Sequence, residues 1–489
     1  MPLGKAFHNK EFFSHPNATE PYKFLPFRFG RINSKVLLTN EIGEHLFLED
    51  HVFENFVKKK IACGSLTYNE LKSRHFLIDN DSSVALDLLA LKTRTKHAII
   101  SQFTGLHIFV VTLRCDYSCP YCQVSRQSED KAQYDMAYED AERGLNITFQ
   151  SPSPNIKIEF QGGESLLNFS LIQEIVKKAE EMNISYGKDI EFVVATNLSY
   201  LNDDIIRFAE QHNFYFSTSL DGPQDLHNSN RPRPGKNGYE LTVNGIRKIQ
   251  DYLGVDRVSA LMTTTEASLK RVKDIVDEYV TLGFRNIFLR PMSPYGFAVK
   301  TNAFNKYNED RWLDFYKEGL RYILELNKQG IFIIEQYTAL ILSKLLTPYD
   351  TGYVDLRSPS GAGIGAVVFN YDGDVYATDE ARMLAEMGDK TFRIGNLKDN
   401  TYEEIFTSDN LLDAIEQSIT ESSPMCIDCV YQPLCGSDPV YHHATQGDFV
   451  GHKMKSGFCR RNMGIFEHIF TLLDNDKDAQ KIFQSWIRT

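Results

Sequence analysis

The sequence predicts an α/β protein built around an incomplete parallel barrel of six strand–helix units. Between Leu106 and about Pro291, short apolar runs rich in β-branched residues alternate with segments whose apolar residues recur at helical spacing. Right-handed crossovers of this kind build a parallel sheet, and six units make about three quarters of a barrel. The chain of 489 residues exceeds one ordinary core. We therefore expect three domains: residues 1–100, the barrel at 101–300, and an extension at 301–489.

Residues 1–100 are predicted to form a small module of three strands followed by helices. The strands are expected at 24–29, 35–39 and 44–48, and Asp50 is placed to cap a helix that follows. A second helix is expected over 68–76. This winged-helix-like order resembles the peptide-recognition module of many peptide-modifying enzymes, in which a leader peptide adds a strand to a free sheet edge. A purely supporting role is the alternative.

The barrel strands are predicted at 107–114, 156–161, 190–196, 214–220, 257–264 and 285–291. Helices are expected to start near Met136, Phe169, Asn202, Tyr239 and Ser268. Asn202 can cap its helix with its side-chain oxygen. In such barrels the functional site lies at the C-terminal ends of the strands, so residues there are the ones to inspect.

A tight group of three cysteines follows the first predicted strand. Cys115, Cys119 and Cys122 have C-x3-C-x2-C spacing, and three thiolates on one loop suit a [4Fe-4S] cluster. A structural zinc site normally takes four protein ligands, but zinc or three buried thiols remain the alternatives. The loop resembles that of radical S-adenosylmethionine (SAM) enzymes, whose cluster leaves one iron open to chelate SAM. Tyr121 stands where this family often places an aromatic ring near the adenine.

Later strand ends carry residues that the same resemblance assigns to SAM. Gly162, Gly163 and Glu164 match a Gly-Gly-Glu element, in which the glycines admit the ligand and the carboxylate accepts from the SAM ammonium group. The third strand ends with Thr196-Asn197, close to the family's Thr-Asn-Gly. Leu198 replaces that glycine.

The fourth predicted strand ends with Ser219 and Asp221, which the resemblance assigns to the SAM ribose. Arg231 is expected to pair with the methionyl carboxylate, with Arg233 as a near rival. Asn228 departs from the family's His-Asp-x-x-Arg pattern. Each of these residues alone is compatible with ordinary loop capping, and their common order along the strands is what favours SAM.

The extension is predicted to begin with helices at 312–326 and 331–346 and to continue with a hairpin over 361–376. Asp372-Gly373 is the expected hairpin turn. A helix is expected near 402–406, and one or two terminal helices at 465–486. Asp379 and Glu380 are the residues we name as a possible acid or base, although the sequence does not single out a catalytic group.

A second cysteine group lies near the C-terminus, at Cys426, Cys429, Cys435 and Cys459. It resembles the SPASM extension of peptide-modifying radical SAM enzymes, which holds auxiliary iron–sulfur clusters. Thr378 and Pro439 stand where a full extension has cysteines, so one auxiliary [4Fe-4S] cluster on the four retained residues is the expectation. A four-cysteine zinc site is the alternative.

Composition narrows the function classes. A net charge of -12 disfavours a nucleic-acid partner. No apolar run approaches the ~18 residues that cross a bilayer, and the N-terminal residues lack the apolar stretch of a signal peptide. We therefore expect a cytoplasmic protein that does not engage a membrane, whose cysteines are ligands rather than disulfides. Cys63 stands alone and is expected to be buried.

The whole chain resembles a radical SAM peptide maturase with a SPASM-like extension. Its order, with the Tyr371–Tyr376 and Asp379–Met383 runs, looks most like the maturase of His-Xaa-Ser peptide systems. The resemblance implies a 5′-deoxyadenosyl radical that oxidises, and in the leading hypothesis crosslinks, side chains of a ribosomal precursor peptide. It also implies an electron donor such as flavodoxin or ferredoxin. A formylglycine-forming sulfatase maturase and a non-catalytic zinc-binding module are the alternatives.

Overall fold

The computed structural model describes residues 21–79, 84–307 and 309–487. The chain divides into two compact units. The smaller unit contains the described residues up to Lys96 together with Asp428–Pro433, and the larger one contains His97–Ile427 and the chain from Leu434 onwards. Each unit is described by itself.

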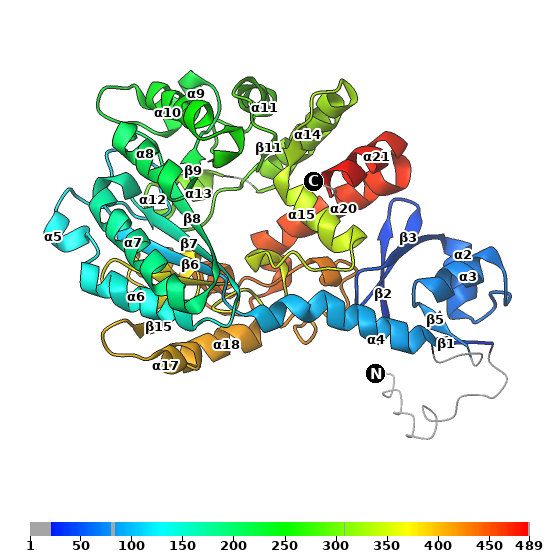
Figure 1. The fold of residues 1–489 in the computed structure, drawn as a ribbon. Helices are drawn as coiled ribbons and strands as arrows, with labels where there is room; N and C mark the ends of the chain where they lie inside the picture. Colours follow the sequence, from blue (N-terminus) through cyan, green and yellow to red (C-terminus); the bar gives the residue numbers. More distant parts are fainter. Residues whose placement is uncertain (1–20, 80–83, 308, 488–489) are drawn as a thin grey trace, which may run out of the picture. The chain divides into compact units, whose positions relative to one another are not determined.

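The smaller unit contains the three predicted strands. β2 (Phe27–Ile32), β3 (Lys35–Asn40) and β4 (His45–Glu49) form an antiparallel sheet in the order β2-β3-β4 (Figure 1). The remaining elements of this unit are β1 (Lys23–Phe24), which pairs with β5 (Leu77–Ile78), and helices α2 (Asp50–Val57), α3 (Leu66–Ser73) and α4 (Val84–His97). Phe56, Leu71 and Phe76 are fully buried between sheet and helices.

Two details of this unit differ from the expectations. Asp50 is not the cap of α2: Glu49 holds that position without a side-chain hydrogen bond, and Asp50 lies in the first turn. An acidic residue there still interacts favourably with the helix dipole, which is why the two positions are hard to separate by sequence. Cys63 is exposed rather than buried, because it lies in the loop between α2 and α3.

The larger unit is organised around a mostly parallel sheet, as predicted. Its order is β10-β9-β8-β7-β6-β13-β14-β15, and β6 to β10 are parallel neighbours. The five parallel strands are β6 (Leu106–Thr112), β7 (Asn155–Gly162), β8 (Asp189–Thr196), β9 (Tyr215–Ser219) and β10 (Val258–Leu261). Phe109 and Phe160, paired in register across β6 and β7, are fully buried.

The prediction of a sixth barrel strand over 285–291 is wrong for most of that range. Only Asn286–Ile287 (β11) is a strand, and it pairs in parallel with β12 (Ile334–Glu335) instead of joining the main sheet. The Glu335 carboxylate accepts a hydrogen bond from the amide of Leu289 at 3.3 Å. A side chain therefore binds this amide where a backbone carbonyl of a neighbouring strand would bind it in a sheet. One bond at 2.9 Å, from the Thr264 amide to the Arg290 carbonyl, still joins this segment to the end of the β10 segment.

The opposite edge of the sheet is extended by the predicted hairpin. β13 (Ala366–Phe369) pairs in parallel with β6, followed by antiparallel β14 (Asp374–Tyr376) and β15 (Arg393–Asn396). Gly373 occupies the turn with φ of 86°, a conformation that favours glycine. The hairpin itself was predicted, but its place beside β6 was not.

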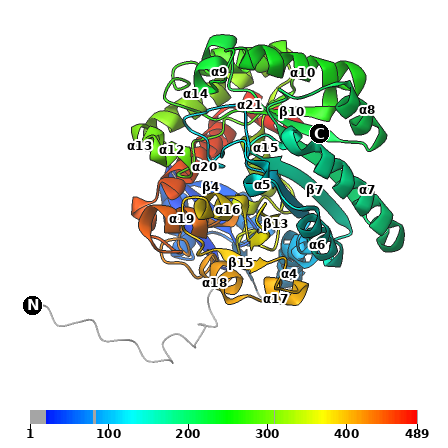
Figure 2. The ribbon, with the colours of Figure 1, turned by 90° about the vertical axis from the view of Figure 1, so that its left-hand side faces the viewer.

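Helices surround this sheet, and several start where predicted. Asn202 caps α8 by accepting a hydrogen bond from the amide of Ile205 at 3.0 Å. The helices on the barrel are α5 (Lys131–Tyr134), α6 (Tyr138–Gln150), α7 (Phe169–Tyr186), α8 (Asp203–Gln211), α9 (Gln224–Asn230), α10 (Gly238–Tyr252) and α11 (Val272–Thr281). Figure 2 shows α6 and α7 side by side on the outside of the sheet.

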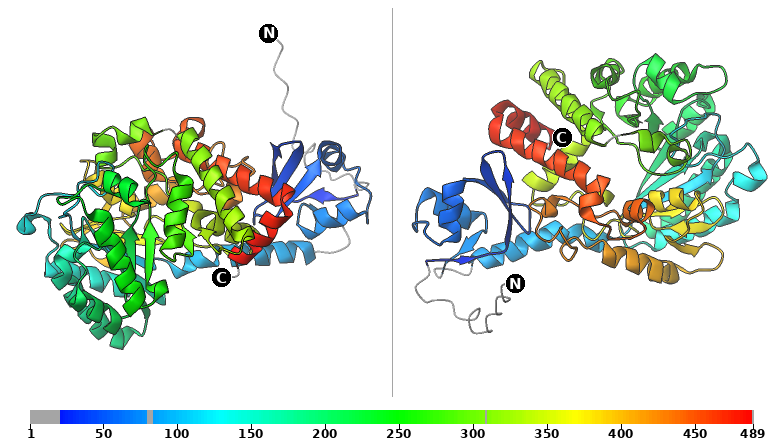
Figure 3. Two further views of the ribbon diagram at one scale, coloured as in Figure 1. Left: turned by 90° about the horizontal axis from the view of Figure 1, so that it is seen from above. Right: turned by 180° about the vertical axis from the view of Figure 1, so that it is seen from behind.

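The extension adds the remaining helices. They are α12 (Phe297–Lys300), α13 (Ala303–Lys306), α14 (Glu309–Lys328), α15 (Gln336–Leu346), α16 (Asp379–Ala385), α17 (Tyr402–Phe406), α18 (Asp409–Gln417), α19 (Pro439–Gln446), α20 (Gly457–Asn475) and α21 (Lys477–Trp486). In Figure 3, α20 and α21 pack beside α14. Among the described residues, no helix is both long and apolar enough to span a bilayer.

Candidate functional site

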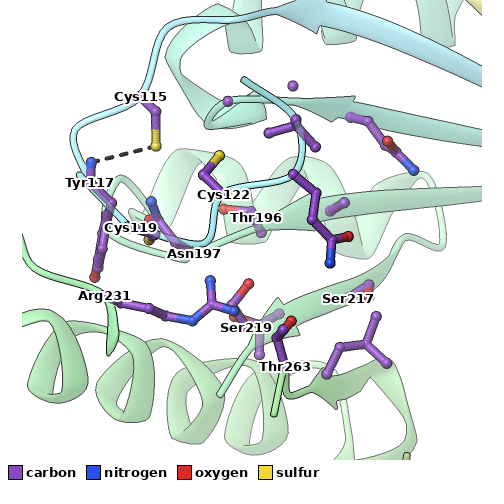
Figure 4. Close-up of a pocket in the computed structure, with 18 of the residues that line it drawn as sticks. Cys115, Tyr117, Cys119, Cys122, Thr196, Asn197, Ser217, Ser219, Arg231 and Thr263 are labelled. Carbon is purple, nitrogen blue, oxygen red and sulfur yellow. Dashed lines mark hydrogen bonds between the residues drawn. The ribbon is translucent and has the colours of Figure 1, made fainter. Parts of the chain in front are cut away.

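A cavity of about 230 Å³ lies at the C-terminal ends of the parallel strands. The sequence-predicted residues that line it are Cys115, Cys119, Tyr121, Cys122, Gly162, Gly163, Asn197, Ser219, Arg231 and Asp379. Figure 4 shows the three cysteines on their loop, with Arg231 and Ser219 facing them across the cavity. Residues that are up to 264 positions apart in sequence thus meet at one end of the sheet.

The cysteine loop is held from both ends. At its start, the Arg114 guanidinium donates to both oxygens of Asp135 at 2.7 and 2.8 Å, and this buried bidentate pair fixes the chain leaving β6. Farther along, the Ser118 amide donates to the Pro232 carbonyl at 2.7 Å. The Tyr117 amide donates to Cys115 Sγ at 3.4 Å, a contact drawn in Figure 4.

The surroundings of the thiols matter for their ligand chemistry. Burial raises the pKa of Cys119 to about 12 and raises the pKa of Cys115 well above its ordinary value. A thiolate at neutral pH would therefore need a neighbouring positive charge of the kind that a metal supplies. In the part of the chain that the structure describes, no three Cys, His, Asp or Glu side chains form a group around one metal ion.

The two glycines after β7 have a structural role that the sequence did not reveal. A Cβ on Gly162 would stand 2.3 Å from the Thr112 carbonyl oxygen, and one on Gly163 would stand 2.4 Å from the Arg114 carbonyl oxygen. The Gly163 amide donates to Thr112 at 2.8 Å. The missing side chains therefore let the end of β7 pack against the start of the cysteine loop, in addition to leaving the cavity open.

Glu164 is fully buried behind the cavity wall. Its carboxylate accepts hydrogen bonds from Thr196 Oγ1 at 2.5 Å and from the Asn197 amide at 2.7 Å, and it also caps the following turn at Leu166. Burial raises its pKa to about 7, while these hydrogen bonds act to lower it. The carboxylate thus ties the end of β7 to the end of β8, and its contact with an ammonium group stays a prediction.

Tyr121, Asp221 and Arg231 form one buried group. Asp221 accepts hydrogen bonds from the Tyr121 hydroxyl and from Arg231 Nη2, the latter at 3.1 Å, and the guanidinium lies 5.4 Å from the centre of the Tyr121 ring. Arg231 Nε is buried without a hydrogen-bond partner in the described chain. Arg231 lines the cavity while Asp221 lies behind it, so Asp221 positions the arginine and leaves a donor for a ligand carboxylate.

The rival arginine is committed elsewhere. Arg233 contacts Asp116 with Nε and Nη2 at 3.2 and 3.1 Å, and Asn197 Nδ2 donates to the same carboxylate at 3.0 Å. Leu198, in place of the expected glycine, takes the left-handed conformation with φ of 65° that glycine would adopt easily. Its buried side chain packs against Gly245, which offsets part of the backbone strain.

Comparison with known proteins identifies the barrel. Residues 109–289 match the model of the radical SAM superfamily. This part of the chain is a radical SAM domain. Its matched range begins in β6 and ends after β11, and it includes the cysteine loop and the barrel residues predicted to contact SAM. Domains of this family use a [4Fe-4S] cluster and SAM.

Similarity to known proteins extends beyond the radical SAM domain. The cysteine-type anaerobic sulfatase-maturating enzyme of Clostridium novyi is 24% identical over 374 residues, which cover 73% of this chain and 93% of that enzyme. The structure of native anSMEcpe with bound AdoMet aligns with TM-score 0.63 and 19% identity over 77% of this chain and all of that one. Streptococcus suis SuiB bound to precursor peptide SuiA aligns with TM-score 0.53 and 14% identity, over 90% of this chain and all of that one. The two structures establish a shared fold.

The cavity residues fit the family's cofactors. Cys115, Cys119 and Cys122 would hold the cluster, and the free Nε of Arg231 would meet the SAM carboxylate. Tyr121 and Ser219 line the same space. When bound, the cluster and SAM supply a one-electron cleavage that the side chains cannot carry out, and the protein orients SAM and encloses the reaction.

The two acidic residues named as a possible acid or base, Asp379 and Glu380, line different cavities. Both begin α16, yet Asp379 lines this cavity and accepts from buried Arg382 at 2.6 Å, whereas Glu380 lines a different cavity. Thr378, at a position where a cysteine was expected, caps α16 by accepting from the Ala381 amide at 3.0 Å. Pro439 likewise occupies the first turn of α19. Both replacements thus begin helices.

The C-terminal cysteines fall into different units. Cys426, Cys435 and Cys459 lie in the larger unit, and Cys429 lies in the segment grouped with the smaller one. Within the larger unit, Cys459 lies in the first turn of α20, where Ser456 caps the helix, and Asn462 Nδ2 lies 3.9 Å from Cys435 Sγ. The auxiliary cluster on these residues stays a prediction.

Several lining residues were missed by the sequence reasoning. Among them are Tyr117, Glu159, Gln161, Ser217, Thr218, Thr263, Arg290 and Met383. Arg290 ends the predicted sixth strand, so the strand-end rule could have found it. Met383 lies in α16, which the sequence analysis did not predict, and nothing local to that segment indicates the cavity.

Proposed function

We propose that this protein is a radical SAM maturase that oxidatively modifies, and most simply crosslinks, side chains of a ribosomally synthesised precursor peptide. The observation that carries the proposal is the radical SAM cavity whose wall is completed by α16 of the extension, through Asp379 and Met383. A fold likeness to peptide-bound SuiB over 90% of the chain supports it. Among such maturases, the sequence runs at Tyr371–Tyr376 and Asp379–Met383 favour the His-Xaa-Ser peptide system.

The proposed reaction balances with SAM as the oxidant. SAM is split into methionine and 5′-deoxyadenosine, while the peptide loses two hydrogens: one as an atom, and one as a proton with an electron that returns to the iron–sulfur centres. A cytoplasmic flavodoxin or ferredoxin would supply the priming electron. The side chain that accepts the proton must border the cavity, and Asp379 and Glu159 are the carboxylates that do so.

A peptide leader would dock on the N-terminal module. In the described chain, β2 and β4 are the outer strands of the three-stranded sheet and each pairs with β3 alone. A strand with unpaired backbone groups can accept an extended peptide as a further strand. These two outer strands support the peptide proposal.

A second candidate is formylglycine formation on a sulfatase. The 24% identity to a sulfatase-maturating enzyme over 93% of that enzyme's length favours it. The two reactions leave different groups: a crosslink leaves no free aldehyde, whereas formylglycine carries one. Hydrazide trapping therefore distinguishes them directly.

The test is anaerobic turnover of the reconstituted full-length enzyme with SAM, dithionite and two peptides. One peptide is a small precursor-like peptide with His-Xaa-Ser repeats, and the other carries a sulfatase consensus. We expect 5′-deoxyadenosine and a precursor that has lost two hydrogens and does not react with hydrazide. Cys122→Ala is the control and should form neither product. A hydrazide-reactive product from the sulfatase peptide, with an unchanged precursor, would replace the proposal with the second candidate.

A further inference from the structure

A second cavity of about 290 Å³ lies within the larger unit, beside the radical SAM cavity. Leu261 and Arg290 line both cavities. Consecutive residues at the start of α16 also divide between them, with Asp379 lining the first and Glu380 the second. The second cavity is therefore close enough to hold a part of the same substrate that reacts in the first.

Three carboxylates from separate segments converge on this cavity. Asp355 comes from the short helix Val354–Leu356, Glu380 from α16, and Asp438 from the cap of α19. We call this space the acidic pocket. None of the three forms an ion pair with a described residue. Burial, and then the charge of a neighbouring carboxylate, raises the pKa of Asp355 to about 6 and those of Glu380 and Asp438 to about 7.

A buried hydroxyl points to a ligand in the same place. Tyr295 is 1% exposed and lines the acidic pocket, and its hydroxyl has no hydrogen-bond partner in the described chain. Burial and then the charges of Asp438, Glu380 and Asp355 raise the pKa of Tyr295, and all four residues line the same pocket. A buried polar group without a partner is destabilising, and a hydrogen-bonding guest would relieve that cost.

The rest of the pocket suits a long side chain with a charged end. Leu261, Phe288, Pro291, Leu340 and Phe458 supply apolar walls. Such walls fit a methylene stem, while the carboxylates fit a cationic head. A bare metal ion would gain nothing from the apolar walls.

Two arginines, Arg290 and Arg461, also line the acidic pocket, but they do not balance its negative charge. Arg461 lies over the rings of Tyr441 and Phe458, at 5.9 and 5.4 Å from their centres, and approaches Glu309 at 3.9 Å. Arg290 lines the same pocket, and its positive charge acts to lower the pKa of Asp355 and of Glu380. Above about pH 7, where the three pocket carboxylates are ionised, they and Glu309 outnumber the two guanidinium groups, which favours a cationic guest over an anionic one.

We propose that the acidic pocket receives the cationic side chain of a lysine or arginine that lies near the modified residue in the peptide substrate. This inference rests on the proposed peptide function and extends it to substrate specificity. The guest would donate to the pocket carboxylates and to the Tyr295 hydroxyl oxygen, and it would fix the position of the reacting residue in the neighbouring cavity.

The test compares two neutral-backbone probes on the full-length, cluster-reconstituted enzyme with SAM. N-acetylarginine methylamide carries the cation, and N-acetylcitrulline methylamide has nearly the same shape without charge. Equilibrium dialysis at about pH 8 should show the arginine probe binding about tenfold more tightly. In Asp355→Asn and Glu380→Gln the ratio should fall to about twofold. Asp413→Asn, which changes an exposed carboxylate of α18, is the matched control and should keep the full ratio.

The outcomes separate this inference from the proposed function. Equal binding of the two probes, no binding of the arginine probe, or a preference that survives both substitutions would overturn the acidic pocket. The comparison of the two probes is made on the wild-type enzyme, so it stays informative even if a variant misfolds. An enzyme that prefers the arginine probe but modifies no peptide would instead overturn the peptide function. An enzyme that modifies its precursor without the preference would overturn the pocket alone.

Discussion

A single methyl group at Gly163 should disable the radical SAM cavity. In Gly163→Ala the new Cβ would stand 2.4 Å from the Arg114 carbonyl oxygen and 2.6 Å from that of Leu113, about 1 Å inside ordinary contact at 3.4 Å. Both obstacles are backbone atoms next to Cys115, so the cysteine loop itself must move. Overpacking of this kind costs about 1–3 kcal/mol of folding stability. A shift of about 1 Å in a reacting group can cost ~10²-fold in rate.

The assay for this variant has three readouts: the thermal unfolding midpoint, iron bound after anaerobic reconstitution, and the initial rate of 5′-deoxyadenosine formation. We expect a lower midpoint, less iron, and a rate reduced about 100-fold. Gly105→Ala is the matched control, because its Cβ would meet the Asn155 carbonyl oxygen at an ordinary 3.4 Å. If Gly163→Ala kept wild-type iron and a rate within about twofold of wild type, the argument that these glycines set the loop position would be wrong.

Three further predictions concern other parts of the larger unit and the cysteines. Arg231→Lys removes both the Nε donor and the Nη2 that contacts Asp221, and should weaken SAM binding more than tenfold by dialysis. Arg285→Lys, at an exposed position, is the control and should not weaken it. Two four-iron clusters predict roughly eight irons per chain by metal analysis; about four irons with one zinc would contradict the auxiliary cluster. Burial raises the pKa of Glu380 to about 7 from its ordinary 4.5, so the stability it contributes is full below about pH 4.5 and is lost as the pH rises through 7. The urea midpoint should fall from about pH 5 to about pH 8, and less so in Glu380→Gln; equal slopes would contradict this assignment.

The sequence predicted correctly those features that depend on interactions between residues close together in the chain. The cap at Asn202 and the helix Tyr402–Phe406 both appear as expected, because capping bonds and helical spacing act over a few residues. The cysteine loop and the strand-end residues were found because a parallel barrel gathers its strand ends at one place. The choice of Arg231 over Arg233 agrees with their partners, since only Arg231 lines the cavity.

Features decided by distant segments were missed. The sixth strand reads as apolar and β-branched, but Glu335, nearly fifty residues later, takes one of its backbone donors. The acidic pocket was missed for the same reason, because Asp355 and Asp438 meet only after the extension folds onto the barrel. Glu164 was assigned to a ligand, whereas its hydrogen bonds show a carboxylate that also joins two strands.

The place of β13 beside β6 has a consequence for the order of events during synthesis. β6, which leads into the cysteine loop, pairs with β13 from Leu106↔Ala366 onwards, so this neighbour leaves the ribosome roughly 260 residues later. At about 5–20 residues per second, that interval lasts roughly 13–50 s. During that interval β6 can pair only with β7, and its other edge stays open. Arrival of the hairpin would then close that edge, so the order of translation itself would set when the sheet is completed.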